Sequence, residues 1–313
     1  MISFVMPAYK ARFLAQAIES ILSQTDSDWE LVIVDDESPE DLSSIVAGYH
    51  DSRIRYYRNE HNLGGENLVR QWNYAITLAK GDWIALAADD DLYSPVFCEE
   101  CVRLLTKYPD VNLVRARVLQ IDEWGKALWD DGVLPEFTNK YEFLYDWLAS
   151  KVFTCIGNYL FRKEALMSID GFIDFPCAFG SDIATPIALS KNGVANTADM
   201  LFSFRHFRQH LSSDKRHFVE KLTGITQLSE WFRNLKYDEP VMDVDKHYYS
   251  ILNEKYLHDK CVYDYFNHVI RYVAFGELHY YIKFCKLATV TDKLKMYLRW
   301  IKRNMLSRKS INE

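Results

Sequence analysis

Three consecutive aspartates, Asp89-Asp90-Asp91, directly follow the apolar run Trp83 to Ala88. Such a run between polar residues is typical of a strand that is buried on both faces. Crowded carboxylates repel one another, which raises a pKa unless a cation lies between them. Mg²⁺ and Mn²⁺ prefer oxygen ligands and are often shared with substrate phosphates. The aspartates therefore indicate a metal–diphosphate site. The structural alternative is that Asp91 or Ser94 caps a helix that begins at Pro95.

Two earlier strands are predicted to bring more polar residues to the same place. Ile2 to Met6 is an apolar run that ends at Pro7-Ala8-Tyr9, and Trp29 to Val34 is one that ends at Asp35-Asp36. Because the carboxyl ends of parallel strands meet at one edge of a sheet, these segments and the three aspartates could line one crevice. A sheet used only as a scaffold has no need of acids repeated at that edge.

Strand-like and helical patterns alternate four times in the first 107 residues. This alternation predicts an α/β fold with a mostly parallel sheet, flanked by helices and built from right-handed βαβ units. No Gly-x-Gly-x-x-Gly follows the first strand, and no glycine-rich loop ends in Lys-Ser/Thr. The usual dinucleotide-linked oxidoreductases and nucleotide hydrolases are therefore disfavoured.

Composition narrows the class of protein further. The net charge of −7 argues against general binding of nucleic acid, which needs a basic surface. No apolar run approaches the roughly 20 residues of a membrane span, and no signal peptide is visible, so we expect a cytoplasmic protein. The six scattered cysteines suit free thiols in a reducing compartment. Beyond residue 212 glycine becomes scarce and helical periodicity is continuous, which predicts domains 1–212 and 213–313.

Several motifs, in this order and spacing, resemble those of the family 2 glycosyltransferases, whose nucleotide-diphospho-sugar transferase fold is of the GT-A type. The resemblance covers about residues 1–212. The resembling segments are Val5 to Tyr9, Ala17 to Thr25, Trp29 to Ser38, Asn62 to Gly64, Gly81 to Ile84 and Asp89 to Asp91. It implies an enzyme that moves a sugar from a UDP-type nucleotide donor to a saccharide or lipid-linked saccharide.

The resemblance also implies roles for the donor-binding residues. Asp36 would accept from the N3–H of a uracil-type base, since a charged acceptor makes the stronger hydrogen bond. Pro7, Ala8 and Tyr9 would form the wall against which the base lies, although Tyr9 could equally pack in the core. Asn67 would help to shape the donor pocket.

The metal motif departs from its commonest form. Alignment on Leu92-Tyr93 places Ala88 where many relatives carry the first aspartate. Asp90 then matches the aspartate that reaches the Mn²⁺ or Mg²⁺ ion, and Asp89 matches the intervening residue, which the resemblance would place near the ribose. Alternatively, Asp89 and Asp91 form the spaced pair. His210, in a segment that closes over the donor in relatives, would lie near the metal or the diphosphate, because imidazole can bind Mn²⁺.

Asp182 of Gly180-Ser181-Asp182 resembles the family's catalytic base. Inverting transfer needs a carboxylate that takes the proton of the acceptor hydroxyl as it attacks the anomeric carbon. The structural alternative is an acid in the first turn of a helix, where it suits the helix dipole.

The region 213–313 carries no family resemblance, and its tyrosines suit a helical core or a homodimer interface. Near its end, basic residues accompany an apolar helical face made by Leu294, Tyr297, Leu298, Ile301 and Met305. Such a helix could lie on the inner face of an anionic membrane, or dock on its own domain. The competing hypotheses for the whole chain are a non-catalytic nucleotide-sugar-binding scaffold and a sugar-phosphate nucleotidyltransferase, which would need a basic glycine-rich loop after the first strand.

Overall fold

The computed structural model describes residues 1–207, 215–235 and 240–309, with side chains up to residue 304. The chain divides into two compact units. The first comprises Met1–Asp174 with Ser181–His210, and the second comprises Phe175–Gly180 with Leu211–Glu313. The boundary predicted at residue 212 lies outside the described residues. The assignment of Phe175–Gly180 to the second unit was not anticipated from the sequence.

The first unit is built on a parallel half-sheet in the order β3-β2-β1-β4. Its strands are β1 (Ile2–Ala8), β2 (Trp29–Asp35), β3 (Ile54–Arg58) and β4 (Trp83–Leu86). Strand β1 continues through Pro7 to Ala8, whereas the sequence predicted its end at Met6. Pro7 is tolerated because it pairs with Val34 of β2 beyond the last pairing of β1 with β4, at Val5 and Leu86.

Beyond β4 the sheet becomes mixed. Strand β9 runs antiparallel to both β4 and β6, β6 is parallel to β10, and β5 is antiparallel to β10. Two short strands, β7 and β8, pair with β6 and β10. The bounds are β5 (Leu92–Tyr93), β6 (Leu113–Ile121), β7 (Ala127–Asp130), β8 (Phe137–Thr138), β9 (Tyr159–Arg162) and β10 (Val194–Arg205). The prediction of an α/β fold with flanking helices and a helical C-terminal region is confirmed, and the parallel order is confined to part of the sheet.

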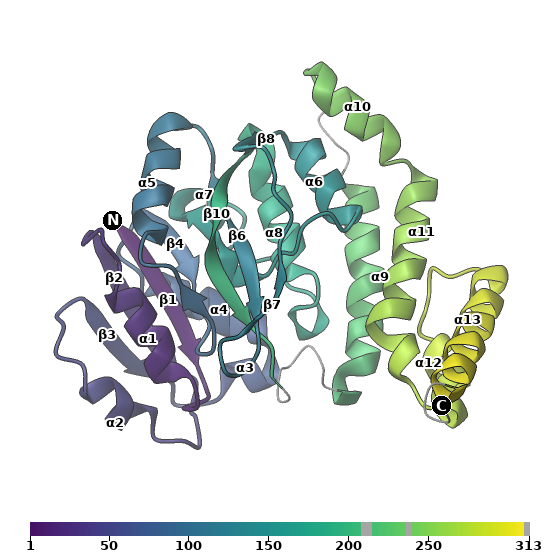
Figure 1. Cartoon of the computed structure of the whole chain (residues 1–313), viewed down its shortest axis with the longest axis horizontal. Helices are drawn as coiled ribbons and strands as arrows, with labels where there is room; N and C mark the ends of the chain where they lie inside the picture. Colours follow the sequence, from purple (N-terminus) through teal and green to yellow (C-terminus); the bar gives the residue numbers. More distant parts are fainter. Residues whose placement is uncertain (208–214, 236–239, 310–313) are drawn as a thin grey trace. The chain divides into compact units, whose positions relative to one another are not determined.

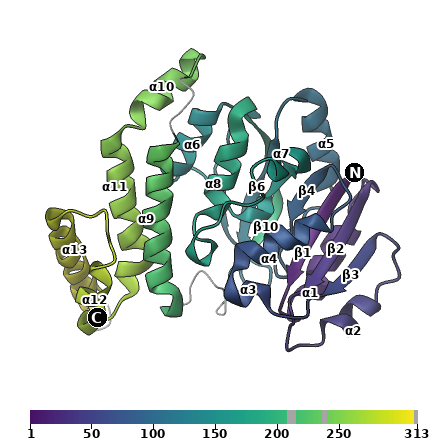
Figure 2. The same cartoon turned by 180° about the vertical axis from the view of Figure 1, so that it is seen from behind.

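Helices cover both faces of this sheet. Apolar residues of α1, α2 and α5 form one core with β1 and β2, while α4 packs on the other face (Figures 1 and 2). Side-chain caps fix several helix starts, with Asp41 capping α2, Asn62 α3 and Asn67 α4. The helices are α1 (Leu14–Leu22), α2 (Leu42–Ala47), α3 (Leu63–Glu66), α4 (Leu68–Thr77), α5 (Phe97–Lys107), α6 (Lys140–Leu148), η1 (Ile156–Asn158), α7 (Lys163–Met167), α8 (Ser181–Leu189) and η3 (Ser190–Asn192).

The second unit is helical. Its core joins α9 to the later helices through Phe218, Leu222, Tyr265, Val269 and Met296. No helix among the described residues is long and apolar enough to span a membrane. The elements are η2 (Pro176–Ala178), η5 (Lys215–His217), α9 (Phe218–Asn234), α10 (Asp243–Ile251), α11 (Glu254–Asp264), the π-helical turn η6 (Tyr265–Val269), η7 (Ile270–Tyr272), η8 (Phe275–Glu277), α12 (Leu278–Ile282) and α13 (Val290–Lys309).

Candidate functional site

Asp89 joins the carboxyl ends of two parallel strands. Its Oδ2 accepts hydrogen bonds from the backbone N–H groups of Tyr9, at 2.7 Å, and Lys10, at 2.8 Å. Tyr9 directly follows β1, and Asp89 lies just beyond β4, so the carboxylate holds both strand ends in place. Burial raises the pKa of Asp89, and the two backbone donors oppose that rise.

Asp91 is held by the end of β10. Its Oδ1 accepts the backbone N–H of Arg205 at 2.8 Å. The Arg205 guanidinium is itself buried, donating to the carbonyl oxygen of Asp90 at 2.8 Å and to Oε1 of Gln16 at 3.0 Å. Burial and the charge of Asp90 raise the pKa of Asp91 well above its usual range. Arg205 was not among the site residues predicted from the sequence, although a basic residue at the end of an apolar strand is a signal that could have indicated it.

Asp90 is the carboxylate that remains open. Among the described residues, no residue other than Asp90 itself donates a hydrogen bond to this side chain, although it is only 7% exposed. Burial, followed by the negative charge of Asp89, raises its pKa to about 7, while Lys10 and Arg205 lower it in part. A buried carboxylate with so few donors is poorly solvated. A cation bound to Asp90 would offset both the cost of its desolvation and its repulsion from Asp89.

The three aspartates do not form a closed metal cage. Among the described residues, the one group of three potential ligand side chains with ligand atoms within 4.8 Å of each other lies elsewhere, in the second unit. The rim therefore fits a divalent ion that is held chiefly by the Asp90 carboxylate and completes its coordination with other oxygens. Mg²⁺ and Mn²⁺ bind in this way when phosphates and water fill the remaining positions.

The acids after β2 are satisfied by the protein itself. Asp35 is fully buried and accepts from Ser38 N–H at 2.8 Å, from the Tyr56 hydroxyl at 2.5 Å and from Arg58. Asp36 is also buried.

Three donors occupy Asp36. Its Oδ1 accepts from Asn59 Nδ2 at 2.7 Å and Leu63 N–H at 2.9 Å, and its Oδ2 accepts from Gly64 N–H at 2.6 Å. A carboxylate has about four acceptor positions, so one remains on Oδ2.

The other predicted donor-binding residues differ in their exposure. The Ala8 side chain is buried in the main core and offers no open surface, and Pro7 is half-buried. Tyr9 is 41% exposed, while its carbonyl oxygen accepts from Ser38 Oγ at 2.7 Å, so the ring is available above a fixed backbone. Asn67 caps α4 through its Oδ1 and donates to Asp174 Oδ2 at 2.5 Å.

Asp182 lies in the first turn of α8 and is half-buried. Its carboxylate and that of Asp91 both raise the pKa of the buried Cys155 thiol, after burial itself. One thiol is therefore near both carboxylates, and the η1 turn beside Cys155 packs against α8, β4 and β6. Asp182 and the aspartate rim are thus linked by their common electrostatic effect on this thiol. His210 lies outside the described residues.

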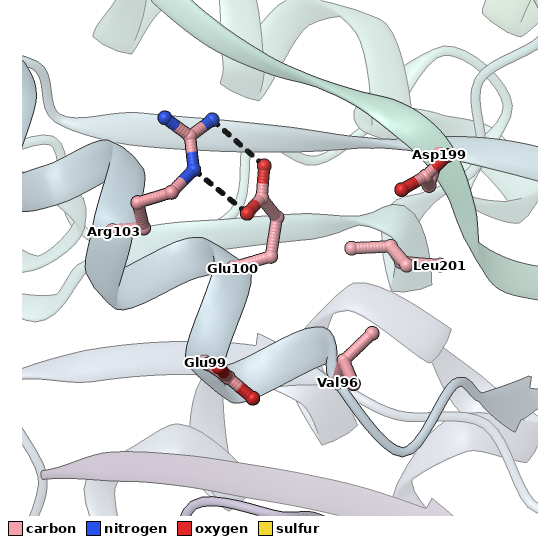
Figure 3. A pocket seen from close by; sticks show the side chains of 6 residues that line it. All are labelled: Val96, Glu99, Glu100, Arg103, Asp199 and Leu201. Atoms are coloured by element: carbon pink, nitrogen blue, oxygen red, sulfur yellow. Dashed lines mark hydrogen bonds and ion pairs between the residues drawn. The ribbon is translucent and has the colours of Figure 1, made fainter.

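A separate surface hollow of about 230 Å³ lies between the start of α5 and β10. Its lining comprises Val96, Glu99, Glu100, Arg103, Asp199 and Leu201. Figure 3 shows Arg103 paired with Glu100, and Arg103 also contacts Glu136. None of the predicted site residues lines this hollow, and its one lining cation, Arg103, is already paired with Glu100.

Residues 3–169 carry the pattern of one protein family. The model of glycosyl transferase family 2 matches residues 3–169, which is more than half of the chain. The chain belongs to glycosyl transferase family 2. The family predicted from the sequence is thereby confirmed, and the match includes the strands that carry Asp36 and Asp90.

Curated relatives support the same assignment. The putative glycosyltransferase EpsE of Bacillus subtilis (strain 168) is 35% identical over 128 residues, which span 40% of this chain and 45% of that protein. The putative colanic acid biosynthesis glycosyl transferase WcaA of Escherichia coli (strain K12) is 43% identical over 98 residues, 30% of this chain and 34% of that protein. The family 2 chain thus matches less than half the length of either relative.

Solved structures show the fold. S. aureus TarS 1-349, crystallised with UDP-GlcNAc, superposes with a TM-score of 0.70 at 15% identity, covering 90% of this chain and 79% of that one. The mannosyltransferase PcManGT from Pyrobaculum calidifontis, in complex with GDP-Man and Mn²⁺, gives a TM-score of 0.58 at 16% identity, with coverages of 97% and 80%. The GT-A type architecture predicted for this family 2 chain is therefore confirmed.

Proposed function

We propose that this family 2 glycosyltransferase moves a sugar, with inversion, from a UDP-type donor to a hydroxyl of a saccharide or lipid-linked saccharide. The observation that carries the proposal is the open carboxylate of Asp90, raised in pKa to about 7 at the rim where β1 and β4 end. Neighbours of the same fold were solved with UDP-GlcNAc and with GDP-Man and Mn²⁺.

Each residue would contribute a distinct part of donor binding. The remaining acceptor position of Asp36 would take the N3–H of the base, and the exposed Tyr9 ring would cover one of its faces. Asp89 fixes the backbone of Tyr9 and Lys10, and Asn67 fixes the start of α4. Asp90 would hold Mn²⁺ or Mg²⁺, which when bound neutralises the departing diphosphate. Asp91 and His210 are the remaining proposed metal contacts.

Asp182 would act as the base. Its carboxylate would take the proton of the acceptor hydroxyl while the hydroxyl oxygen forms a bond to the anomeric carbon. The bond from that carbon to the diphosphate breaks at the same time, so the nucleotide diphosphate leaves with the electron pair.

The decisive experiment replaces the base without changing its size. Asp182→Asn should lower kcat by roughly 10²–10⁴-fold, the usual contribution of a general base, while donor affinity stays nearly constant. Isothermal titration with UDP and Mn²⁺, followed by a transfer assay, measures both quantities. The matched control is Asp199→Asn, an exposed aspartate outside the proposed site. Full transfer activity in Asp182→Asn would refute the proposed role.

One observation favours the scaffold hypothesis. Ala88 stands at the first position of the metal motif, and backbone donors already occupy Asp89 and Asp91. A non-catalytic protein would bind UDP but neither hydrolyse nor transfer any sugar across a broad panel of donors and acceptors, and that outcome would replace the enzyme proposal.

We further propose that α13 contacts the surface of an anionic membrane, where a lipid-linked acceptor would be found. Leu294 is 59% exposed, Leu298 67% and Ile301 39%, which places these residues on one solvent-facing side. Tyr297 instead packs against the core of the second unit. The flanking basic residues are Lys293, Lys295, Arg299, Lys302 and Arg303.

Vesicle sedimentation tests this contact. Anionic vesicles should bind the protein and neutral ones should not, and Leu298→Gln should weaken the binding, whereas Val241→Gln, at an 88% exposed position outside α13, should not. Equal binding to both vesicle types, or burial of the same face in a homodimer measured by light scattering, would exclude the proposal.

A further inference from the structure

Three side chains of different chemistry meet in the second unit. A thiol from Cys177, an imidazole from His217 and a carboxylate from Glu220 bring one ligand atom each to within 4.8 Å of one another. Cys177 lies in the loop that precedes α8. His217 directly precedes α9, and Glu220 lies in the first turn of that helix. About 40 residues separate Cys177 from His217 in the sequence, so the fold brings these side chains together.

The loop is laid along one face of α9 by close packing. Glu220, Gly224 and Leu228 are spaced four residues apart and therefore share that face. A Cβ at Gly224 would lie 3.2 Å from the carbonyl oxygen of Pro176, and one at Gly180 would lie 2.8 Å from Leu228. The loop thus runs in register with α9, which sets Cys177 over Glu220.

The backbone at Cys177 is held in an unfavourable conformation. Cys177 has φ 56° and Ala178 has φ 55°, the left-handed region that side chains other than glycine rarely adopt. Such conformations are strained and persist where the surrounding structure holds them in place, often at sites of function. In this conformation the Cys177 sulfur lies within 4.8 Å of ligand atoms of His217 and Glu220.

Cys177 also differs from the other cysteines. The remaining five of the six are buried, whereas Cys177 is half-exposed and can therefore be reached by an ion from solvent. Burial, and after it the Glu220 carboxylate, raises the pKa of the Cys177 thiol to about 11. Binding of a metal by the sulfur would consequently release the thiol proton to solvent.

We propose that Cys177, His217 and Glu220 bind a zinc ion, with water as the fourth ligand. Zinc accepts sulfur, nitrogen and oxygen ligands in tetrahedral geometry, and bonds of about 2.0–2.3 Å place ligand atoms roughly 3.3–3.8 Å apart. Because the three atoms lie within 4.8 Å of one another, an approach of at most about 1.5 Å would bring them to this spacing. The thiolate and carboxylate balance the charge of the ion, and the sulfur favours zinc over Mg²⁺ or Mn²⁺.

A zinc ion at this site would hold the loop Phe175–Gly180, which leads to the proposed base, against α9. The loop Phe175–Gly180 continues directly into Ser181-Asp182, the start of α8. Zinc would fix that loop on the first turn of α9 by a bond stronger than packing alone. The proposal is independent of the donor metal, because the aspartates of the first unit contribute no ligand to it.

Metal titration of the full chain tests the site. Protein stripped with chelator should bind one equivalent of Zn²⁺, measured by competition with a chromogenic chelator, and Co²⁺ should give a thiolate-to-cobalt charge-transfer band. Cys177→Ser should abolish that band. Cys177→Ser and Glu220→Gln should each weaken zinc binding by more than the roughly 10–100-fold expected of outer-shell residues. Matched controls are Glu230→Gln, exposed on the same helix, and His247→Gln on α10, which should bind as the parent does.

Two results would overturn the proposal. The first is a cobalt complex of the unaltered protein that lacks a thiolate band, which needs no variant to fold. The second is zinc binding that survives Cys177→Ser but disappears in Asp90→Asn, because the ion would then belong to the aspartates. Neither outcome depends on transfer activity, so the zinc site and the proposed function can fail separately.

Discussion

Acids follow both β2 and β4, yet the protein surrounds them differently. After β2, Asp35 accepts hydrogen bonds from Ser38, Tyr56 and Arg58, and Asp36 accepts three more. After β4, no other residue in the described part of the chain donates a hydrogen bond to Asp90, and its pKa rises to about 7. The same sequence pattern can therefore serve structure at one strand end and leave a carboxylate open for an ion at the next.

The largest effect should follow from removing the open carboxylate. Asp90→Asn should lower transfer by roughly 10²–10⁴-fold, because an ion bound there would supply several kcal/mol of charge stabilisation. The folded protein should be no less stable, since the substitution removes a buried, repelled charge. Steady-state kinetics over a range of Mn²⁺ concentrations measure the loss. Activity near that of the parent would show that Asp90, like the acids at the end of β2, is not needed to hold an ion.

Removing a satisfied carboxylate should affect stability instead. Asp35→Asn should destabilise the chain by about 2 kcal/mol or more, because hydrogen bonds to a buried charge are each worth roughly 1.5–3 kcal/mol. Urea unfolding measures the change. The control, Asp51→Asn, breaks the more exposed pair with Arg53 at 2.7 Å and should cost less than about 1 kcal/mol. Equal losses in both variants would contradict the distinction.

The pH dependence of stability should come from the β4 end. The pKa of Asp90 is about 7 in the folded chain against an ordinary 3.8, so the folded state holds more protons between these values. Stability of the metal-free protein should therefore fall as pH rises through that window.

Asp90→Asn should flatten this fall. Melting temperatures of both proteins at about pH 5 and about pH 8 provide the measurement, with roughly 2–4 °C expected for each kcal/mol. Mn²⁺ with UDP at the higher pH should restore the parent but not the variant. An identical pH slope in the two proteins would place the titrating group elsewhere.

The smallest effect should come from Tyr9, whose backbone is fixed but whose ring is 41% exposed. Tyr9→Ala should raise the KM for the donor by roughly three- to tenfold, the loss expected for one stacking contact of about 0.5–1.5 kcal/mol, with kcat and stability nearly constant. Tyr9→Phe should retain parental kinetics. A loss of folding in Tyr9→Ala would identify the ring as core.

The parts of the fold that local pattern controls could be predicted from the sequence. The parallel strands, the helices between them and the positions of Asp36 and Asp89 just beyond β2 and β4, the two neighbours of β1, follow from apolar runs and strand direction. Partners distant in sequence could not be predicted. Arg205 reaches the aspartates from the end of β10, a strand that is far from them in the sequence. The left-handed backbone at Cys177 has no local signal in the sequence either.

The tight contact at Gly64 has a consequence for anyone altering donor choice. A methyl group there would lie 2.8 Å from Asp36 Oδ2, and the Gly64 amide orients that same oxygen. Residues 62 to 64 therefore help to set the position of the Asp36 carboxylate in the proposed base-binding site. Mutant libraries aimed at a new nucleotide preference should begin with residues 62 to 64. A small shift of α3 would move the acceptor oxygen of Asp36 without replacing the carboxylate.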